Sequence, residues 1–237
     1  MKELDHNLIR PFCKNLRGNK QSMAENSNSI LKWFLDYQRN YEEYIRTAKS
    51  YYSASSLLSD NNWLMNREKT LYDVKITSGM LLAVDFGKSY GGECGYIHTA
   101  LCLDITGNKV FVVPMTTVVS VVNSAYHPID NPSGNRSLWL GRIEDGFTEK
   151  SALNLRDAKY VSIGRIIGDF SCVDDNITSE IKMCVMKALF STQVNTFIQN
   201  VSKLEKANEK LRFEKEELRR ENQSLKDKNK NLALKSN

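Results

Sequence analysis

The hydrophobic pattern near the N-terminus has a helical period. From Ser22 to about Leu58, apolar and aromatic residues recur at alternating steps of four and three, which places them on one helix face. These residues are Ile30, Phe34, Tyr37, Tyr41, Tyr44, Ala48 and Tyr51. The polar residues 27–29 are start signals and the polar run 59–62 is a stop signal. We interpret the aromatic stripe as a packing face.

From about Tyr72 the period changes to that of strands and turns. The predicted strands are MLLAVDF (80–86), HTALCLDI (98–105), KVFVVPMTT (109–117), SLWLGRI (137–143) and KYVSIGRI (159–166). Short turn sequences separate several of them, such as Thr-Gly-Asn at 106–108. Short strands with few helices between them predict an α+β fold built on a small, strongly curved sheet or partly open barrel. Residues 178–190 then read as an amphipathic helix.

The tail, from about residue 192, carries a heptad repeat. The d positions are Phe197, Leu204, Leu211, Leu218, Leu225 and Leu232, and the a positions are Val201, Asn208, Lys215, Asn222 and Asn229. Leucine at d with asparagine at a favours a parallel two-stranded coiled coil, and hence a homodimer. The charges at g (214, 221) and e (219, 226) are attractive in that dimer. The alternative is a single helix that folds back on the 22–58 helix.

Together these patterns divide the chain into three parts: a helical region (1–71), a strand-rich domain (72–192) and a coiled coil (193–237). Composition adds limits. A hydrophobic content of 41% supports a core, and the net charge of +5 is compatible with a polyanionic partner. Five cysteines without a CxxC pair, and only three histidines, do not favour a zinc site. We found neither a signal-peptide pattern nor an apolar run of about 18 residues, so we expect a soluble, cytoplasmic protein without membrane contact.

The stretch GYIHTALCLDITGNKVFVVPMTT (95–117) holds the candidate chemistry. It reads as a hairpin with His98 where the first strand begins, and with Thr116 and Thr117 where the second ends. In an antiparallel pair joined by a short turn, these two ends meet. We therefore predict a pocket there, in which imidazole transfers protons near neutral pH.

Several motifs occur around this hairpin in a fixed order. A strand ITSGMLLAVDF precedes a Gly-rich loop GKSYGGECGY, the hairpin ends in VPMTT, and SALNLRDAKYVSIGRIIG follows. This order resembles the MazF/PemK family of toxin endoribonucleases over residues 76–192, about half of the chain. The resemblance implies a curved SH3-like barrel that cleaves single-stranded RNA without a metal or cofactor. In the implied reaction, the ribose 2′-OH attacks the adjacent phosphate, and the products carry a cyclic phosphate and a 5′-hydroxyl. The resemblance also implies dimerisation through the barrel and control by an antitoxin, protein or RNA, in a toxin–antitoxin or phage-defence system.

The resemblance also implies roles for single residues. His98 stands where the family usually has a catalytic arginine, and Thr116 matches the second catalytic position. Thr117 and Glu93 match further positions of the family and are implied RNA contacts. Lys88, Lys159 and Arg165 are the candidate cations for holding RNA phosphates. His127, in AYHPID, is a second histidine candidate, and Arg142 is a further one.

Other functions are compatible with the same residues. The loss of the arginine also fits a non-catalytic module that binds RNA or a protein and dimerises through the zipper. Related barrels inhibit DNA gyrase, which is a third hypothesis. Cys94 or Cys102 beside His98 would give a thiol enzyme, although Cys102 lies in an apolar run. GKSYGG lacks the spacing of a phosphate-binding P-loop.

Overall fold

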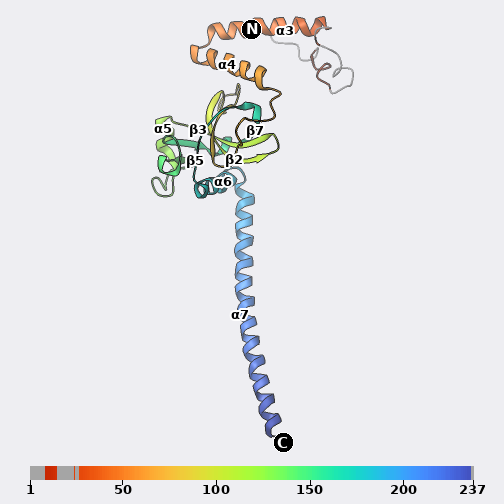
Figure 1. Cartoon of the computed structure of the whole chain (residues 1–237), viewed down its shortest axis with the longest axis vertical. Helices are drawn as coiled ribbons and strands as arrows, with labels where there is room; N and C mark the ends of the chain where they lie inside the picture. The colour runs from red at the N-terminus through yellow and green to blue at the C-terminus, as the bar shows by residue number, and fades with distance from the viewer. Residues whose placement is uncertain (1–8, 15–23, 25–26, 236–237) are drawn as a thin grey trace. The chain divides into compact units, whose positions relative to one another are not determined.

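The computed structural model describes residues 9–14, 24 and 27–235 (Figure 1). The chain divides into two compact units. Unit 1 consists of Met1–Met115 and Lys159–Cys172, and unit 2 of Thr116–Ala158 and Val173–Asn237. Each unit contains both strands and helices, so the predicted α+β class is confirmed.

Helix α3 (Asn28–Thr47) begins at the predicted signal in unit 1. The Ser27 hydroxyl accepts the backbone N–H of Ile30 at 3.4 Å, as an N-cap does. Earlier positions of the predicted helix, 22, 23, 25 and 26, lie outside the described residues. The expected aromatic packing face is only partly formed, because Phe34 is 52% exposed while the rings of Tyr41 and Tyr44 stack 6.0 Å apart.

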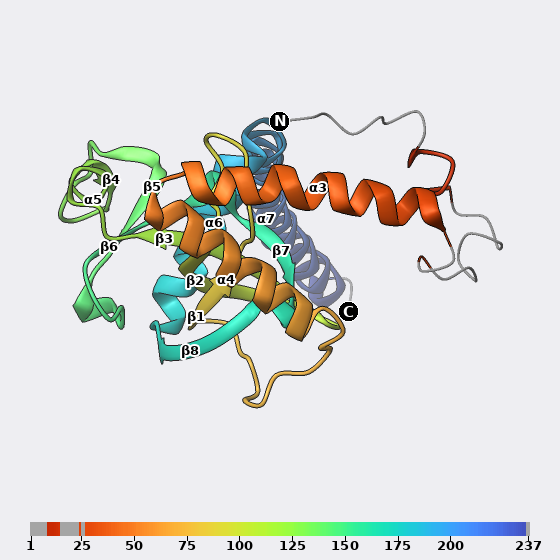
Figure 2. The same ribbon diagram turned by 90° about the horizontal axis from the view of Figure 1, so that it is seen from above.

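The prediction of one continuous helix over 22–58 is wrong. Ala48 and Lys49 adopt extended backbone, so α3 ends and a second helix, α4 (Ser50–Asn66), begins. The Ser53 hydroxyl on α4 donates to the backbone carbonyl of Ile45 on α3 at 2.9 Å, across the break. Figure 2 shows the two helices side by side. A side chain thus competes with the helix for a backbone acceptor, and the break carries no proline or glycine that would have signalled it.

The predicted stop at 59–62 lies inside α4 because these polar side chains have a tertiary partner. Asp85, at the end of β1, is only 4% exposed. Ser59 donates to its Oδ1 at 2.6 Å, and Asn62 donates to its Oδ2 at 2.9 Å. The backbone N–H of Gly87 adds a third bond at 2.9 Å. The polar side of α4 therefore satisfies a buried carboxylate, and this bonding replaces the turn tendency of the same residues.

Five antiparallel strands form the sheet of unit 1, in the order β7–β3–β2–β1–β8. Their bounds are Met80–Asp85 (β1), Ile97–Thr106 (β2), Lys109–Thr116 (β3), Lys159–Ser162 (β7) and Ile166–Cys172 (β8). One face of the sheet encloses an apolar core that includes Leu82, Val84, Ala100, Val112 and Ile166. The first three strands agree with the predicted segments within one or two residues.

This sheet is strongly curved, as the chain connection between its two edges requires. The edge strands β7 and β8 are joined only by η4 (Ile163–Arg165), a three-residue 3₁₀ turn. Four strand spacings in a flat sheet would separate the edges by about 19 Å. The four residue steps from Ser162 to Ile166 reach at most about 14 Å. The sheet must therefore curl, which agrees with the expected curvature. Among the described strands β7 and β8 do not pair, so no closed barrel forms.

The predicted strand 159–166 is interrupted by η4. The Ser162 hydroxyl accepts the backbone N–H of Gly164 at 3.3 Å, which turns the chain before the alternation of the strand is complete. The second edge strand, β8, was not predicted beyond residue 166.

Among the described residues, unit 2 is built on three short strands, one short helix and two longer helices. The strands are β4 (Ala125–Tyr126), β5 (Asn135–Gly141) and β6 (Ser151–Asn154), and the helices are α5 (Val119–Ser124), α6 (Asp175–Leu189) and α7 (Ser191–Lys235), with 3₁₀ turns η2 (Ile143–Asp145) and η3 (Leu155–Asp157). β4 runs parallel to β5, and β6 antiparallel, so the eight described strands form a mixed arrangement. β4 and β6 were not predicted, because two and four residues carry too little periodic signal. In the part of the chain that the structure describes, no helix combines the length and apolarity that a membrane span needs.

The bonding at Asp85 predicts a large loss of stability on its removal. We expect Asp85→Ala to lower the free energy of unfolding by about 3 kcal/mol, because Ser59 and Asn62 lose their acceptor in a buried site. The exposed Asp73→Ala should change it by no more than about 0.5 kcal/mol. Urea unfolding followed by circular dichroism measures both variants. Equal midpoints for the two would contradict the role given to Asp85.

Candidate functional site

Unit 1 contains a cavity of about 390 Å³ next to α4. Three segments that are distant in sequence line it: α4, the start of the Gly-rich loop after β1, and the region of η4. The side chains that give it chemical character are Trp63, Arg67, Asp85, Lys88 and Arg165. Its volume lies in the range of small-ligand sites. Two of the predicted RNA-binding residues, Lys88 and Arg165, are therefore brought together here.

Helices α3 and α4 both contact the side chain of Lys88. Its Nζ lies 2.8 Å from Oδ1 of Asp60 on α4 and 4.2 Å from the ring centroid of Tyr41 on α3. Partial burial lowers the pKa of Lys88, but the hydrogen bond and charge of Asp60 outweigh it and raise the pKa overall. Burial also raises the pKa of Tyr41 to about 12, with Asp60 adding to the effect. Lys88 thus remains a cation and Tyr41 a neutral phenol at physiological pH.

Arg165 presents its guanidinium group from η4. Its Nη1 donates to the backbone carbonyl of Asp85 at 2.9 Å, a bond that orients the group without neutralising its charge. The guanidinium lies close to Gly87, where an added Cβ would come within 3.1 Å of Nη1. Gly87 also has φ +77°, which favours glycine. The glycine at this position therefore gives the arginine its room.

The contribution of α4 to the cavity was missed in the sequence analysis. Trp63 is 61% exposed, and the Arg67 guanidinium carbon lies 5.9 Å from the centroid of its ring. The spacing of four residues on one helix puts the two side chains on the same face. That spacing was the available signal, but nothing local related it to Lys88 or Arg165.

His98 lies on the other face of the sheet from Asp85. In β2 it pairs with Val84, and its neighbour Ile97 pairs with Asp85. Cross-strand partners share a face and successive residues alternate. His98, which is half-buried, is therefore on the side of the apolar core with Val84, while Asp85 faces α4. The strand separates this histidine from the side chain of Asp85 that borders the cavity.

Thr116 and Thr117 lie at the end of β3. The Thr116 hydroxyl accepts the backbone N–H of Val118 at 3.3 Å, a local turn contact, and Thr117 is exposed. The hairpin register pairs Ala100 with Pro114. His98 precedes Ala100 by two residues in β2, and Thr116 follows Pro114 by two residues in β3.

The two remaining predicted contacts, Glu93 and Lys159, do not line the cavity. The Glu93 carboxylate accepts the backbone N–H of Tyr90 at 3.4 Å and so shapes the Gly-rich loop. Lys159, on β7, places its Nζ 5.0 Å from the ring centroid of Phe86. Neither placement gives the residue a contact with Lys88 or Arg165.

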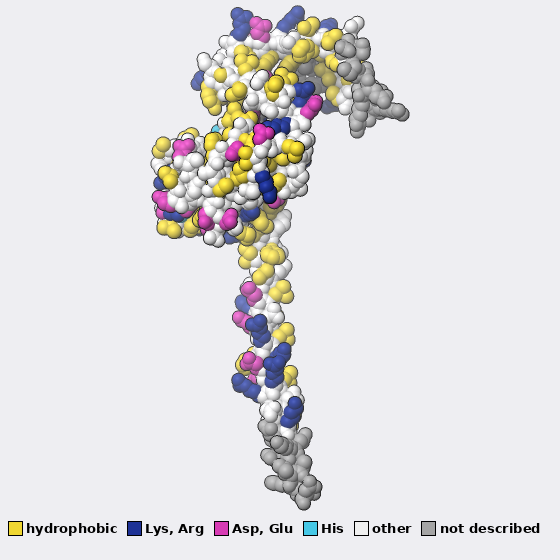
Figure 3. Space-filling view, viewed as in Figure 1, with side chains coloured by type: hydrophobic (Ala, Val, Ile, Leu, Met, Phe, Trp, Pro, Cys, Tyr) yellow, Lys and Arg dark blue, Asp and Glu magenta, His cyan; other side chains and the backbone are white. Residues whose placement is uncertain are grey.

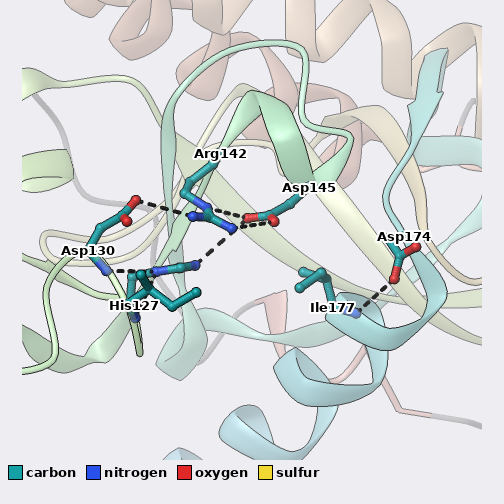
Figure 4. A network of polar contacts seen from close by, with 7 residues as sticks. His127, Asp130, Arg142, Asp145, Asp174 and Ile177 are labelled. Carbon is teal, nitrogen blue, oxygen red and sulfur yellow. Dashed lines mark hydrogen bonds and ion pairs between the residues drawn. The ribbon is translucent and has the colours of Figure 1, made fainter.

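The second histidine candidate belongs to a buried network in unit 2 (Figure 4). His127 is 1% exposed, and its Nδ1 accepts the backbone N–H groups of Ile129 and Asp130 at 3.2 and 3.1 Å. Its Nε2 lies 3.8 Å from Oδ2 of Asp145. With Nδ1 as an acceptor, the proton of the neutral ring is on Nε2. Burial and these contacts give His127 a structural role in shaping its loop.

Arg142 completes the network. Its Nε and Nη2 donate to the two carboxylate oxygens of Asp145 at 2.9 and 2.8 Å. This bidentate bond lowers the pKa of Asp145, against the opposing effect of burial. Arg142 therefore stabilises the fold of unit 2.

No protein-family model matches the chain, and a search of curated proteins found no match. The resemblance to MazF/PemK toxins accordingly rests on the motifs of the sequence.

The Arg142–Asp145 pair predicts a stability that depends on pH. The pKa of Asp145 is below its ordinary 3.8 in the folded chain, so the pair is fully stabilising above that value and is lost as pH falls through the lower, folded pKa. We expect Arg142→Gln to cost about 3 kcal/mol at pH 7, because it leaves a buried carboxylate unpaired, and less below pH 3.8.

Urea unfolding at both pH values measures this difference. Arg156, an exposed arginine of η3, provides the matched control as Arg156→Gln. A loss that is independent of pH would show that the Arg142 side chain acts by packing alone.

Proposed function

We propose that the chain acts on single-stranded RNA as a toxin-type endoribonuclease that needs no metal. The observation that supports this best is the cavity of unit 1. It unites Lys88 and Arg165, two of the cations that the sequence offers for RNA phosphates, with an arginine and an exposed tryptophan from α4. Sites for single-stranded nucleic acid usually combine basic side chains along the phosphate backbone with an aromatic side chain on which a base stacks.

In this proposal the residues of the cavity bind the RNA, and the cleavage reaction takes place elsewhere. The guanidinium of Arg165 binds a phosphate in the planar, two-bond geometry that arginine offers. Trp63 stacks on a base, which contributes about 1–3 kcal/mol per base. The ion pair with Asp60 leaves Lys88 a weaker contact than Arg165.

The chemical step uses the hairpin. The 2′-oxygen forms a bond to phosphorus as the bond to the 5′-oxygen breaks, so a proton leaves the 2′-hydroxyl and another reaches the 5′-oxygen. The His98 imidazole transfers protons in this step. The Thr116 hydroxyl donates a hydrogen bond to the phosphate as charge develops on it. The remaining features of the proposal are the SH3-like fold of the family, a cytoplasmic location and an antitoxin partner.

A non-catalytic RNA-binding module is the second candidate, and one observation favours it. His98 faces away from the side of β1 that borders the cavity. Under this alternative the cavity binds RNA and the hairpin serves only the fold.

Cleavage assays separate the two candidates. Purified wild-type protein with EDTA should cut single-stranded RNA and leave cyclic-phosphate and 5′-hydroxyl ends. We expect His98→Ala to slow cleavage at least about 100-fold, because it removes the proton-transfer group. Thr116→Ala should also slow it. Thr106→Ala, at the exposed turn of the same hairpin, is the matched control. Undiminished cleavage by His98→Ala would remove that residue from the site, and RNA binding without any cleavage by the wild type would establish the second candidate.

Binding assays test the cavity independently of chemistry. We expect Trp63→Ala to weaken RNA binding about 5- to 150-fold, from the loss of one stacked base. Arg165→Gln should weaken it too, and should reduce the dependence of log affinity on log salt by about 0.7. Lys75→Gln removes an equal charge from an exposed position that is not among the cavity residues. Fluorescence anisotropy with a labelled oligonucleotide measures all three. An equal effect of Lys75→Gln would mean that RNA meets only the general positive charge.

A further inference from the structure

In the part whose side chains are described, helix α7 exposes a regular apolar stripe (Figure 3). Every seventh side chain is large and apolar, and each is at least half exposed: Phe197 (68%), Leu204 (66%), Leu211 (61%), Leu218 (58%) and Leu225 (50%). Full burial of such a side chain is worth about 1.5–3 kcal/mol. The stripe is therefore a surface whose burial would be strongly favourable.

The spacing of the stripe indicates what kind of surface covers it. A helix that packs on a globular core carries a broad apolar face with three or four such residues in every two turns. Here the repeat is strictly seven residues and the stripe is narrow, which is the pattern of a coiled-coil seam. A strict seven-residue repeat also matches the left-handed supercoil of paired helices. Another helix is thus the occupant that fits.

The charges beside the stripe indicate that this helix is a second copy of α7. In the C-terminal half of the seam, the residues that follow Leu211, Leu218 and Leu225 are basic: Arg212, Arg219 and Lys226. The residues that precede Lys215 and Asn222 are acidic: Glu214 and Glu221. The earlier heptads differ, since Ile198 follows Phe197, Glu205 follows Leu204 and Ala207 precedes Asn208. A parallel pair places each acidic g side chain opposite the basic e side chain five residues on. An antiparallel pair would place basic columns against each other and acidic columns against each other. The complementarity is therefore that of two identical, parallel helices.

The a positions define the limits of the seam. Val194, one heptad before the first predicted a residue, is only 7% exposed and is already covered within the chain. Val201 is half-buried, and Asn208, Lys215 and Asn222 are exposed and polar. Polar residues at a positions lower the stability of a coiled coil but fix its register and its number of strands. The available seam therefore begins at Phe197.

From these observations we propose that α7 pairs with α7 of a second copy of this chain, in a parallel, in-register, two-stranded coiled coil from Phe197 through Leu225. The proposal is independent of the proposed RNA function, because it uses only the helix and its own charges.

The mass of the full chain in solution tests the pairing. Light scattering behind size exclusion should give twice the chain mass for the wild type. Leu211→Glu/Leu218→Glu should give a monomer, with circular dichroism and urea unfolding showing that the remainder is folded. Phe213 offers a matched control, since it is 64% exposed but lies outside the seam, and Phe213→Glu should remain dimeric. A wild-type monomer or trimer, a dimer that survives the double substitution, or a monomer from Phe213→Glu would each overturn the proposal.

Cross-linking tests the direction of the helices. In a parallel, in-register pair, equivalent a residues face each other, so Asn208→Cys should form a covalent dimer on mild oxidation. Phe213→Cys points away from the seam and should cross-link no more than the wild type, whose own five cysteines supply the background. Cross-linking that is equal in the two variants, or absent from Asn208→Cys, would overturn the parallel arrangement.

Discussion

Unit 1 depends on how one buried carboxylate is satisfied. Even after relaxation, an ion removed from water costs several kcal/mol unless hydrogen bonds replace its hydration. For Asp85 the replacement comes from two side chains of α4 and from the backbone at the start of the Gly-rich loop. These bonds attach the helix to the sheet. The same attachment creates the cavity, because α4 brings Trp63 and Arg67 beside Arg165. The carboxylate is thus a structural element, although an acid at the end of a strand invites a catalytic interpretation.

Local periodicity predicted those parts of the fold that local physics determines. The strands at 80–85, 97–106 and 109–116 alternate or run apolar between clear turns, and they form as expected. The run Ser59–Asn62 shows where this reasoning fails. Polar residues in sequence indicate a turn, whereas their actual partner is a carboxylate more than 20 residues away. The interruption at η4 likewise depends on a serine–glycine contact and on the curl of the whole sheet. Both are tertiary effects that override propensity.

In the candidate site, too, some residues could be predicted from local sequence and others depend on tertiary contacts. Lys88 and Arg165 were identified through the ordered motifs, and they do line one cavity. Trp63 and Arg67 belong to a helix outside those motifs, so no local pattern related them to the site. His98 shows the reverse difficulty, because the pattern located it at the start of a strand but could not say which face it takes. Pairing with Val84 decides that question, and the pairing is visible only in the register.

The discontinuity of unit 1 has a consequence for biosynthesis. The strands β7 and β8 form its two edges, yet residues 116–158, which precede them in the chain, belong to unit 2. A ribosome that has completed β3 must translate more than 50 further residues before β8 is complete. At about 5–20 residues per second this takes several seconds. During that interval the nascent β1–β3 hairpins expose both edges and the apolar face that β7 and β8 will cover. Chaperone protection of the emerging chain would matter most in this interval, between the third strand and the eighth.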